Sequence, residues 1–364
     1  MYAFDPTEEQ QMLIDAIQRY ANNDLRTKAR DAEEEGELPA RLIEKGWELG
    51  FLQASIPEEF GGFGERSAVT GVLALEEMAY GDLAGAMAVL TPSLFAMPVL
   101  MQGSPEQKQA YLPGIVEGPW TPYTAALIEP VFDFDANDLR TVAVEQGDSY
   151  LISGEKTFVP FAAEADALMV YANLGGKSQG FIVKRDAPGL TIGERQKTLG
   201  IHALPLYPVR LRDVRVPKAD RLGGPDGHDF APLLASMRVG LASMAVGMAR
   251  GALDYAINYA KEREVFGVKV AQKQAIAFML AEMAVEIESI RLVVWEAAWM
   301  LDNNKPEAAK HAYLALTGAA DMAMMVGDRA VQTLGGHGYI REYPVEMWMR
   351  NARGISTLNG LAIV

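Results

Sequence analysis

Cysteine is absent from the 364-residue sequence, and histidine occurs only four times. Without cysteine the chain can form no disulfide, no thiolate metal site and no cysteine nucleophile. The histidines stand at positions 202, 228, 311 and 337, a spacing that matches no common set of metal ligands. A P-loop and a Gly-x-Ser-x-Gly nucleophile turn are also missing. The sequence therefore predicts no metal site and argues against a hydrolase of the usual kinds.

Positive charge is scarce. The chain has 33 lysines and arginines against 48 aspartates and glutamates, which gives a formal net charge of −15. A chain this acidic repels the phosphate backbone of nucleic acids, so we expect no nucleic-acid partner. A small phosphate-bearing ligand remains compatible with this charge, because a few local arginines can outweigh the overall field.

Long apolar runs are missing as well. Residues 1–6 have neither the basic start nor the apolar run of a signal peptide. The longest weakly polar stretch, 239–249, lies between Arg238 and Arg250 and is far shorter than the roughly 20 residues of a membrane-spanning helix. We therefore expect a soluble, cytoplasmic protein with no membrane partner.

What is present divides the chain into three parts. Residues 1–117 and 229–364 have helical periodicity, whereas 118–228 contains short β-type runs separated by glycine, proline and aspartate. We predict an α+β multidomain fold: an N-terminal helical domain, a central antiparallel β-barrel or sandwich, and a C-terminal helical bundle. No long helical period lies between the strands, which argues against a doubly wound nucleotide fold.

Local signals refine this division. Thr7 with Gln10, and Ser104 with Gln107, have the pattern of capping boxes that begin helices. The acidic run 31–37 is expected to be a solvated helix end or loop. The strongest β-type runs are 149–154, 167–171, 180–183 and 209–216, and the long helices of the last third are 237–259, 276–300 and 312–334.

Two segments of the last third have chemical potential. Arg263 follows a predicted helix, and its planar fork either clamps a pyrophosphate or is simply a solvated helix-end group. Gly335 and Gly336 either let a ligand approach the backbone or only terminate a helix. Because this glycine pair follows a helix rather than a strand, it is not a Rossmann fingerprint.

Taken together, the motifs resemble those of the acyl-CoA dehydrogenases along the whole chain. The matching segments are 4–10, 48–51, 56–64, 154–156, 211–217, 263–267, 332–339, 342–346 and 350–353. The resemblance implies an α-domain, a β-domain and a C-terminal four-helix bundle. It also implies an acyl-CoA substrate, a tetramer that binds FAD between subunits, and a flavoprotein as electron acceptor.

The resemblance also implies a set of binding residues. Arg238 matches an arginine near the thioester and the catalytic base. The residues that would hold the adenosine diphosphate end of FAD, partly across a subunit interface, are Arg263, Phe266, Gln274, Gln332, Gly335 and Gly336.

The sequence departs from the family pattern at the catalytic base. The family reaction needs a carboxylate to take the α-proton of the acyl-CoA. Asn359 occupies the position of the usual glutamate, and Met237 occupies the alternative position just before Arg238. An amide and a thioether cannot serve as this base, so both known base positions are empty.

The positions expected to face the flavin are altered too. Ile128 replaces a hydroxyl-bearing residue, Phe134 replaces a small one, and the bulky pair Val131–Phe132 stands where glycines let the backbone approach the ring. Pro160 offers neither a hydroxyl nor an N–H to the flavin.

Three interpretations follow from these changes. The chain is an acyl-CoA dehydrogenase with another carboxylate as base, such as Glu129 or Glu342. Alternatively, it is an inactive subunit that pairs with an intact paralogue, or a flavin-dependent non-dehydrogenase on the same fold. We favour a member of the family whose own dehydrogenation site lacks its base.

Overall fold

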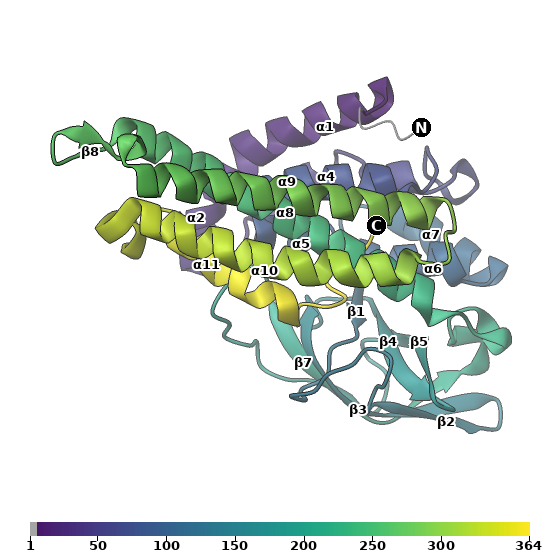
Figure 1. The fold of residues 1–364 in the computed structure, drawn as a ribbon. Coiled ribbons are helices and arrows are strands. Elements are labelled where there is room, and N and C mark those ends of the chain that lie inside the picture. The colour runs from purple at the N-terminus through teal and green to yellow at the C-terminus, as the bar shows by residue number, and fades with distance from the viewer. Residues whose placement is uncertain (1–5) are drawn as a thin grey trace.

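The computed structural model describes residues 6–364. It has a large helical body with a β-sheet domain against one side of it (Figure 1). The N-terminal helices are α1 (Glu8–Tyr20), α2 (Arg26–Glu35), α3 (Ala40–Trp47), α4 (Ala68–Gly81), α5 (Leu83–Val89), α6 (Ser93–Gln102) and α7 (Pro105–Glu117). A π-helical turn, Ala21–Leu25, joins α1 to α2. Both predicted capping boxes are confirmed, at Thr7 and at Ser104.

The β domain is one seven-stranded sheet. Its strands are β1 (Thr124–Ala126), β2 (Val142–Gln146), β3 (Ser149–Pro160), β4 (Ala167–Leu174), β5 (Lys177–Lys184), β6 (Leu190–Ile192) and β7 (Leu206–Pro217). The order is β1-β4-β2-β3-β7-β6, and β5 pairs with β4. All four predicted β-type runs lie in strands of this sheet. The sheet is mixed, because β1 pairs with β4 in parallel whereas β3–β7 and β4–β5 are antiparallel.

The C-terminal part has four helices. They are α8 (Phe230–Glu262), α9 (Gln274–Asp302), α10 (Ala308–Leu334) and α11 (Val345–Gly354). A small hairpin, β8 (Glu264–Val265) and β9 (Val268–Lys269), joins α8 to α9, and a 3₁₀ turn, Gly335–Tyr339, follows α10. The three long helices predicted from the sequence are confirmed, and so is the predicted fold class.

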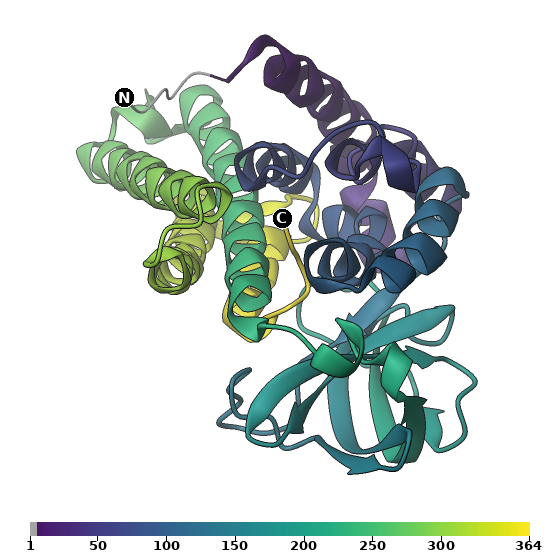
Figure 2. The same cartoon turned by 90° about the vertical axis from the view of Figure 1, so that its right-hand side faces the viewer.

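Helix α8 runs through the middle of the molecule (Figure 2). Among the described residues it is the one helix long and apolar enough to cross a membrane, but 83% of its most apolar window is buried inside the protein. Burial of this kind is typical of a core helix. The 239–249 stretch of the sequence is thus the apolar centre of the bundle.

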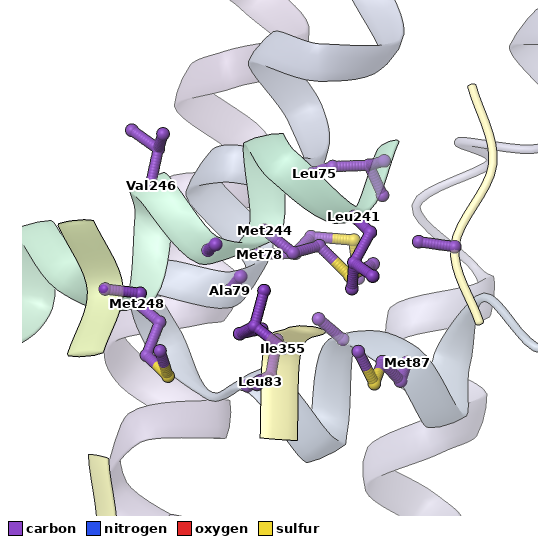
Figure 3. Close-up of a cluster of buried hydrophobic side chains, with 14 of the residues drawn as sticks. Leu75, Met78, Ala79, Leu83, Met87, Leu241, Met244, Val246, Met248 and Ile355 are labelled. Atoms are coloured by element: carbon purple, nitrogen blue, oxygen red, sulfur yellow. The ribbon is translucent and has the colours of Figure 1, made fainter. Parts of the chain in front are cut away.

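Three apolar clusters make up the core. The first joins α1, α4 and α5 to α8–α11, so both helical parts share it. Figure 3 shows its centre, where Leu75 and Met78 of α4 face Leu241 and Met244 of α8. The second lies between α6, α7, the β1–β4 region and the start of α8, and the third is confined to the β domain.

One local expectation was confirmed only in part. The acidic run 31–37 is a helix end, with α2 stopping at Glu35 before Gly36. It is not wholly solvated, because Glu33 is only 5% exposed. Its carboxylate accepts hydrogen bonds from the Arg350 guanidinium and from the His202 amide, the latter at 3.0 Å. Helix α2 is therefore fastened to α11 and to the loop before β7 by a charge that the local sequence pattern does not distinguish from its neighbours.

Candidate functional site

The first part of the site is the early part of α8. Asp229 caps this helix by accepting a hydrogen bond from the Ala231 amide at 3.1 Å. Met237 is 1% exposed and belongs to the second apolar cluster. Arg238 is half-buried, and its guanidinium carbon lies 5.1 Å from the centre of the Tyr313 ring. Burial lowers the pKa of Arg238, while Asp135 opposes this shift. Within residues 6–364, Arg238 forms no ion pair with a carboxylate, and Asp135 acts on it only at longer range.

The second part follows α11. Asn359 is half-buried, and Gly360 after it has a φ of +86°. A Cβ at residue 360 would lie 2.7 Å from Cδ2 of Leu127, just after β1. The left-handed backbone and the close approach both require glycine here. Asn359 is thereby held where the β domain meets the helical body.

The sequence leaves two carboxylates, Glu129 and Glu342, as alternative bases. The Glu129 carboxylate accepts hydrogen bonds from other parts of the β domain. Its Oε1 accepts from the buried Lys156 Nζ at 2.9 Å and from the Thr141 amide at 2.7 Å, and Oε2 accepts from the Arg140 amide at 2.7 Å. Burial raises the pKa of Glu129, but Lys156 and these hydrogen bonds together hold it below its ordinary value. A carboxylate that already accepts three hydrogen bonds, one of them from a lysine, and whose pKa is lowered is a weak acceptor for a substrate proton.

Glu342 is placed no better. It is exposed and precedes α11, whereas Asn359 follows α11. Helix α11, which has ten residues and is about 15 Å long, lies between the two positions in the chain. Of the two alternative bases, Glu129 is thus held by its own hydrogen bonds, and Glu342 is exposed to solvent before α11.

A cavity of about 260 Å³ lies between the end of β3, the 197–201 loop and α11, and its lining includes Phe158, Ile201 and Leu358. Phe158 and Ile201 have φ values of +54° and +48°, an unfavourable conformation for bulky side chains. Their amides donate to Gln196 Oε1 at 2.9 Å and to Asn351 Oδ1 at 2.6 Å. Strain stabilised by buried hydrogen bonds is typical of a ligand site.

Charge at this cavity is positive although the protein is acidic. Its lining includes Lys197, Arg350 and Arg353. Arg350 is paired with Glu33 and Glu346, whereas Arg353 is exposed to solvent. Gln196 and Lys197 were missed by sequence reasoning, since nothing local distinguishes them from other polar loop residues, and Asn351 was noted only as part of the matching segment 350–353. The positive φ values become visible only in the folded chain.

The six residues expected to hold the adenosine diphosphate end of FAD gather at one end of the bundle. That end is where α8 stops, α9 begins and α10 stops (Figure 1). Tyr259 connects α8 to the end of α10. Its hydroxyl lies 2.9 Å from His337 Nδ1 and donates to the Leu334 carbonyl at 3.4 Å. All six are exposed: Arg263, Phe266, Gln274, Gln332, Gly335 and Gly336.

These residues are suited to a pyrophosphate-bearing ligand. Arg263 supplies a planar fork, and no atom lies within 4 Å of a Cβ placed on Gly335 or Gly336, so a ligand can reach their backbone. Arg238 and Arg263, however, stand about 35–40 Å apart along α8. The two arginines therefore lie near opposite ends of α8.

Comparison with known proteins identifies the family of this chain. The family models for the acyl-CoA dehydrogenase N-terminal, middle and C-terminal domains match residues 7–119, 124–214 and 230–362. A probable acyl-CoA dehydrogenase of Bacillus subtilis, YngJ, is 37% identical over 96% of this chain and 94% of its own length. The caffeyl-CoA reductase-Etf complex subunit CarC of Acetobacterium woodii is 35% identical over 98% and 96%.

A solved structure extends the comparison to the fold. The butyryl-CoA dehydrogenase of Megasphaera elsdenii superposes with a TM-score of 0.88 at 32% identity, covering 98% of this chain and 95% of that one. The fold and the matches to the family models together define the class of protein, a dehydrogenase fold with a β domain between two helical domains. The chain belongs to the acyl-CoA dehydrogenase family.

Proposed function

We propose that this chain is an FAD-binding subunit of the acyl-CoA dehydrogenase family whose own dehydrogenation site lacks its base. The observation that carries the proposal is the pair of empty base positions, Asn359 and Met237, together with the engagement of Glu129 and the remote placement of Glu342. The family reaction takes a proton from the α-carbon of an acyl-CoA as a hydride leaves the β-carbon. FAD, when bound, accepts that hydride.

The residues of this chain would bind without completing the reaction. Arg263, Phe266, Gln274, Gln332, Gly335 and Gly336 would hold the adenosine diphosphate end of FAD, and Arg238 would lie near the thioester. The amide of Asn359 can donate a hydrogen bond to a bound acyl-CoA but cannot take its α-proton. The α-carbon proton would stay in place, so the hydride would not leave the β-carbon.

We further propose a soluble, cytoplasmic oligomer that pairs with an intact paralogue or with further copies of itself as a tetramer. The separation of Arg238 from Arg263 along α8 supports an FAD site shared between subunits. The name of the Acetobacterium woodii relative includes an Etf complex, which supports an electron-transferring flavoprotein as a partner of the assembly. The alternatives are a purely structural subunit and a flavin-dependent non-dehydrogenase, and loss of FAD binding would favour the first.

A spectroscopic experiment tests the proposal. We expect the full-length chain to purify with bound FAD, and its flavin absorbance to stay unchanged when butyryl-CoA is added without oxygen. We expect Asn359→Glu to restore flavin bleaching at least 100-fold above the wild-type rate, because it returns a carboxylate to the base position. Asn359→Gln is the matched control, since it has the length of glutamate without its basicity.

Two results would contradict the proposal. Rapid bleaching of the unmodified chain by butyryl-CoA would show that it has a working base. A colourless protein that does not take up added FAD, alone or with an intact paralogue, would show that it is not a flavin-binding subunit.

A further inference from the structure

Residues 361–364 lie inside the molecule although they belong to no helix or strand. Leu361, Ala362, Ile363 and Val364 are only 3–5% exposed. They lie beside the label C in Figure 2, between α8 and the N-terminal helices. An apolar four-residue segment thus fills the space between the two helical parts.

Close contacts fix the path of this segment along α8. Ser236 Oγ donates a hydrogen bond to the backbone oxygen of Val364, and a Cβ at Gly240 would lie 2.9 Å from the Ile363 nitrogen. Ser236 and Gly240 are one helical turn apart and share a face of α8, and Met237, the residue after Ser236, belongs to the same apolar cluster as Ile363. The segment therefore covers the turn of α8 that contains Met237, the alternative base position of the family.

The opposite wall is α4. A Cβ at Gly71 of α4 would lie 2.9 Å from Cβ of Val364. Gly71 of α4 and Gly240 of α8 have no side chains, so the segment fits between these two helices, which elsewhere pack against each other. The segment begins at Gly360, beside Asn359, so it leads from one empty base position to the other.

Polar groups converge on one oxygen of the segment. Arg66 Nε and Nη2 lie 3.1 and 2.9 Å from the backbone oxygen of Val364, which also accepts from Ser236. Ser236 is fully buried. The carbonyl oxygen of an acyl group can accept the same hydrogen bonds, and the apolar side chains beside these donors suit an acyl chain.

We infer that residues 361–364 occupy the place of the acyl group between α4 and α8, and that they must withdraw before an acyl-CoA can bind there. This inference rests on the proposed function for its substrate class. Arg66 and Ser236 hold the segment in place through its backbone, and its apolar side chains take the position of the acyl chain. The segment is thus an internal competitor that lowers the affinity of the site for thioesters.

Calorimetric titration of the full-length protein with butyryl-CoA, octanoyl-CoA and free CoA tests the inference. Ile363→Ser with Leu361→Ser weakens the burial of the segment and leaves both helices intact. We expect this double variant to bind the acyl-CoAs at least tenfold more tightly than the unmodified chain, with unchanged affinity for free CoA. Val144→Ser, on the exposed face of β2, is the matched control and should bind as the unmodified chain does.

Hydrogen exchange gives a second readout on the unmodified chain. We expect amide exchange in residues 361–364 to speed up when octanoyl-CoA saturates the protein. Equal affinities in variant and unmodified chain, or exchange that is unchanged or slower at saturation, would overturn the inference while leaving FAD binding and the missing base untouched. Absence of acyl-CoA binding to every variant of a yellow protein would also overturn it, whereas failure of FAD uptake bears on the proposed function.

Discussion

Asp82 is a fully buried carboxylate at the start of α5. Its Oδ2 accepts a hydrogen bond from the Gly85 amide at 2.7 Å and so caps the helix. Burial raises its pKa to about 6, and hydrogen bonds from the amides of the first turn only partly oppose this shift. The folded protein therefore pays a desolvation cost whenever this side chain is ionised.

The raised pKa of Asp82 predicts a pH-dependent stability. Because the folded pKa lies above the unfolded value of 3.8, the stabilising contribution is complete below about pH 4 and is lost as the pH rises through 6. The full loss amounts to about 3 kcal/mol. Asp82→Asn keeps the capping oxygen but cannot ionise.

We therefore expect the unmodified chain to lose more free energy of unfolding than Asp82→Asn does when the pH is raised from 4.5 to 7.5. Urea unfolding of both proteins at the two pH values measures this difference. Parallel pH profiles for the two proteins would contradict the raised pKa.

At the scale of single residues, the sequence predicts features that depend only on neighbouring positions in the chain. The capping boxes at Thr7 and Ser104 were predictable, because each is complete within four residues. The buried states of Glu33, Asp82 and Lys156 were not, because each depends on residues distant in the chain. At the site, the amide at position 359 could be read from the sequence, and the missing base stays a prediction, whereas the positive φ of Phe158 follows from the folded β domain.

Among the elements, the crossing of α4 and α8 depends on one glycine. A Cβ at Gly247 of α8 would lie 1.9 Å from the Glu76 carbonyl oxygen of α4. Beside this contact, Arg250 and Arg291 donate to the buried Glu76 carboxylate, at 2.7 and 2.6 Å. A larger residue at position 247 must push the two helices apart and so disturb these ion pairs.

We expect Gly247→Ala to lower the free energy of unfolding by about 1–3 kcal/mol through overpacking. The matched control is Gly114→Ala on the exposed face of α7, where nothing lies within 4 Å of an added Cβ. That change should be neutral or stabilising by up to about 1 kcal/mol, because alanine favours the helix. Equal effects of the two substitutions in urea titrations would refute the close contact.

Helices and strands themselves were largely predictable from periodicity. Which elements pair with each other was harder to predict. A β-type run indicates a strand but not the neighbouring strand, and nothing in the sequence of β1 indicates its parallel pairing with β4. The crossing of α4 over α8 likewise depends on contacts between residues about 170 positions apart, such as Arg250 with Glu76.

At the scale of the whole molecule, α9 presents an apolar stripe to solvent. Phe278, Val285 and Leu292 recur every seven residues, so they share one face, and they are 59%, 63% and 47% exposed. An unpaired stripe of this kind is typical of a subunit interface.

We expect light scattering coupled to gel filtration to give an oligomer for the unmodified chain and a smaller species for Val285→Glu, because a buried unpaired charge opposes association. Val144→Glu, on an exposed position of β2, is the control and should leave the mass unchanged. A monomeric unmodified chain would exclude this interface.

The overall division into helical, β and helical parts was predictable from composition and periodicity. The boundaries at 117 and 228 stay predictions as domain limits. How closely the two helical parts join was not predictable, because their shared apolar cluster is assembled from segments that the β domain separates in the chain.

That shared cluster has a consequence for the newly made chain. Helices α4 and α5 leave the ribosome well before α8 is synthesised, and at ordinary translation rates the delay is roughly ten to thirty seconds. During this time only the other N-terminal helices can cover their leucine and methionine side chains, because α8 is not yet present. The β domain has a cluster of its own, so the middle of the chain can complete its folding first. The nascent N-terminal helices are therefore the segment of this protein that most needs a chaperone.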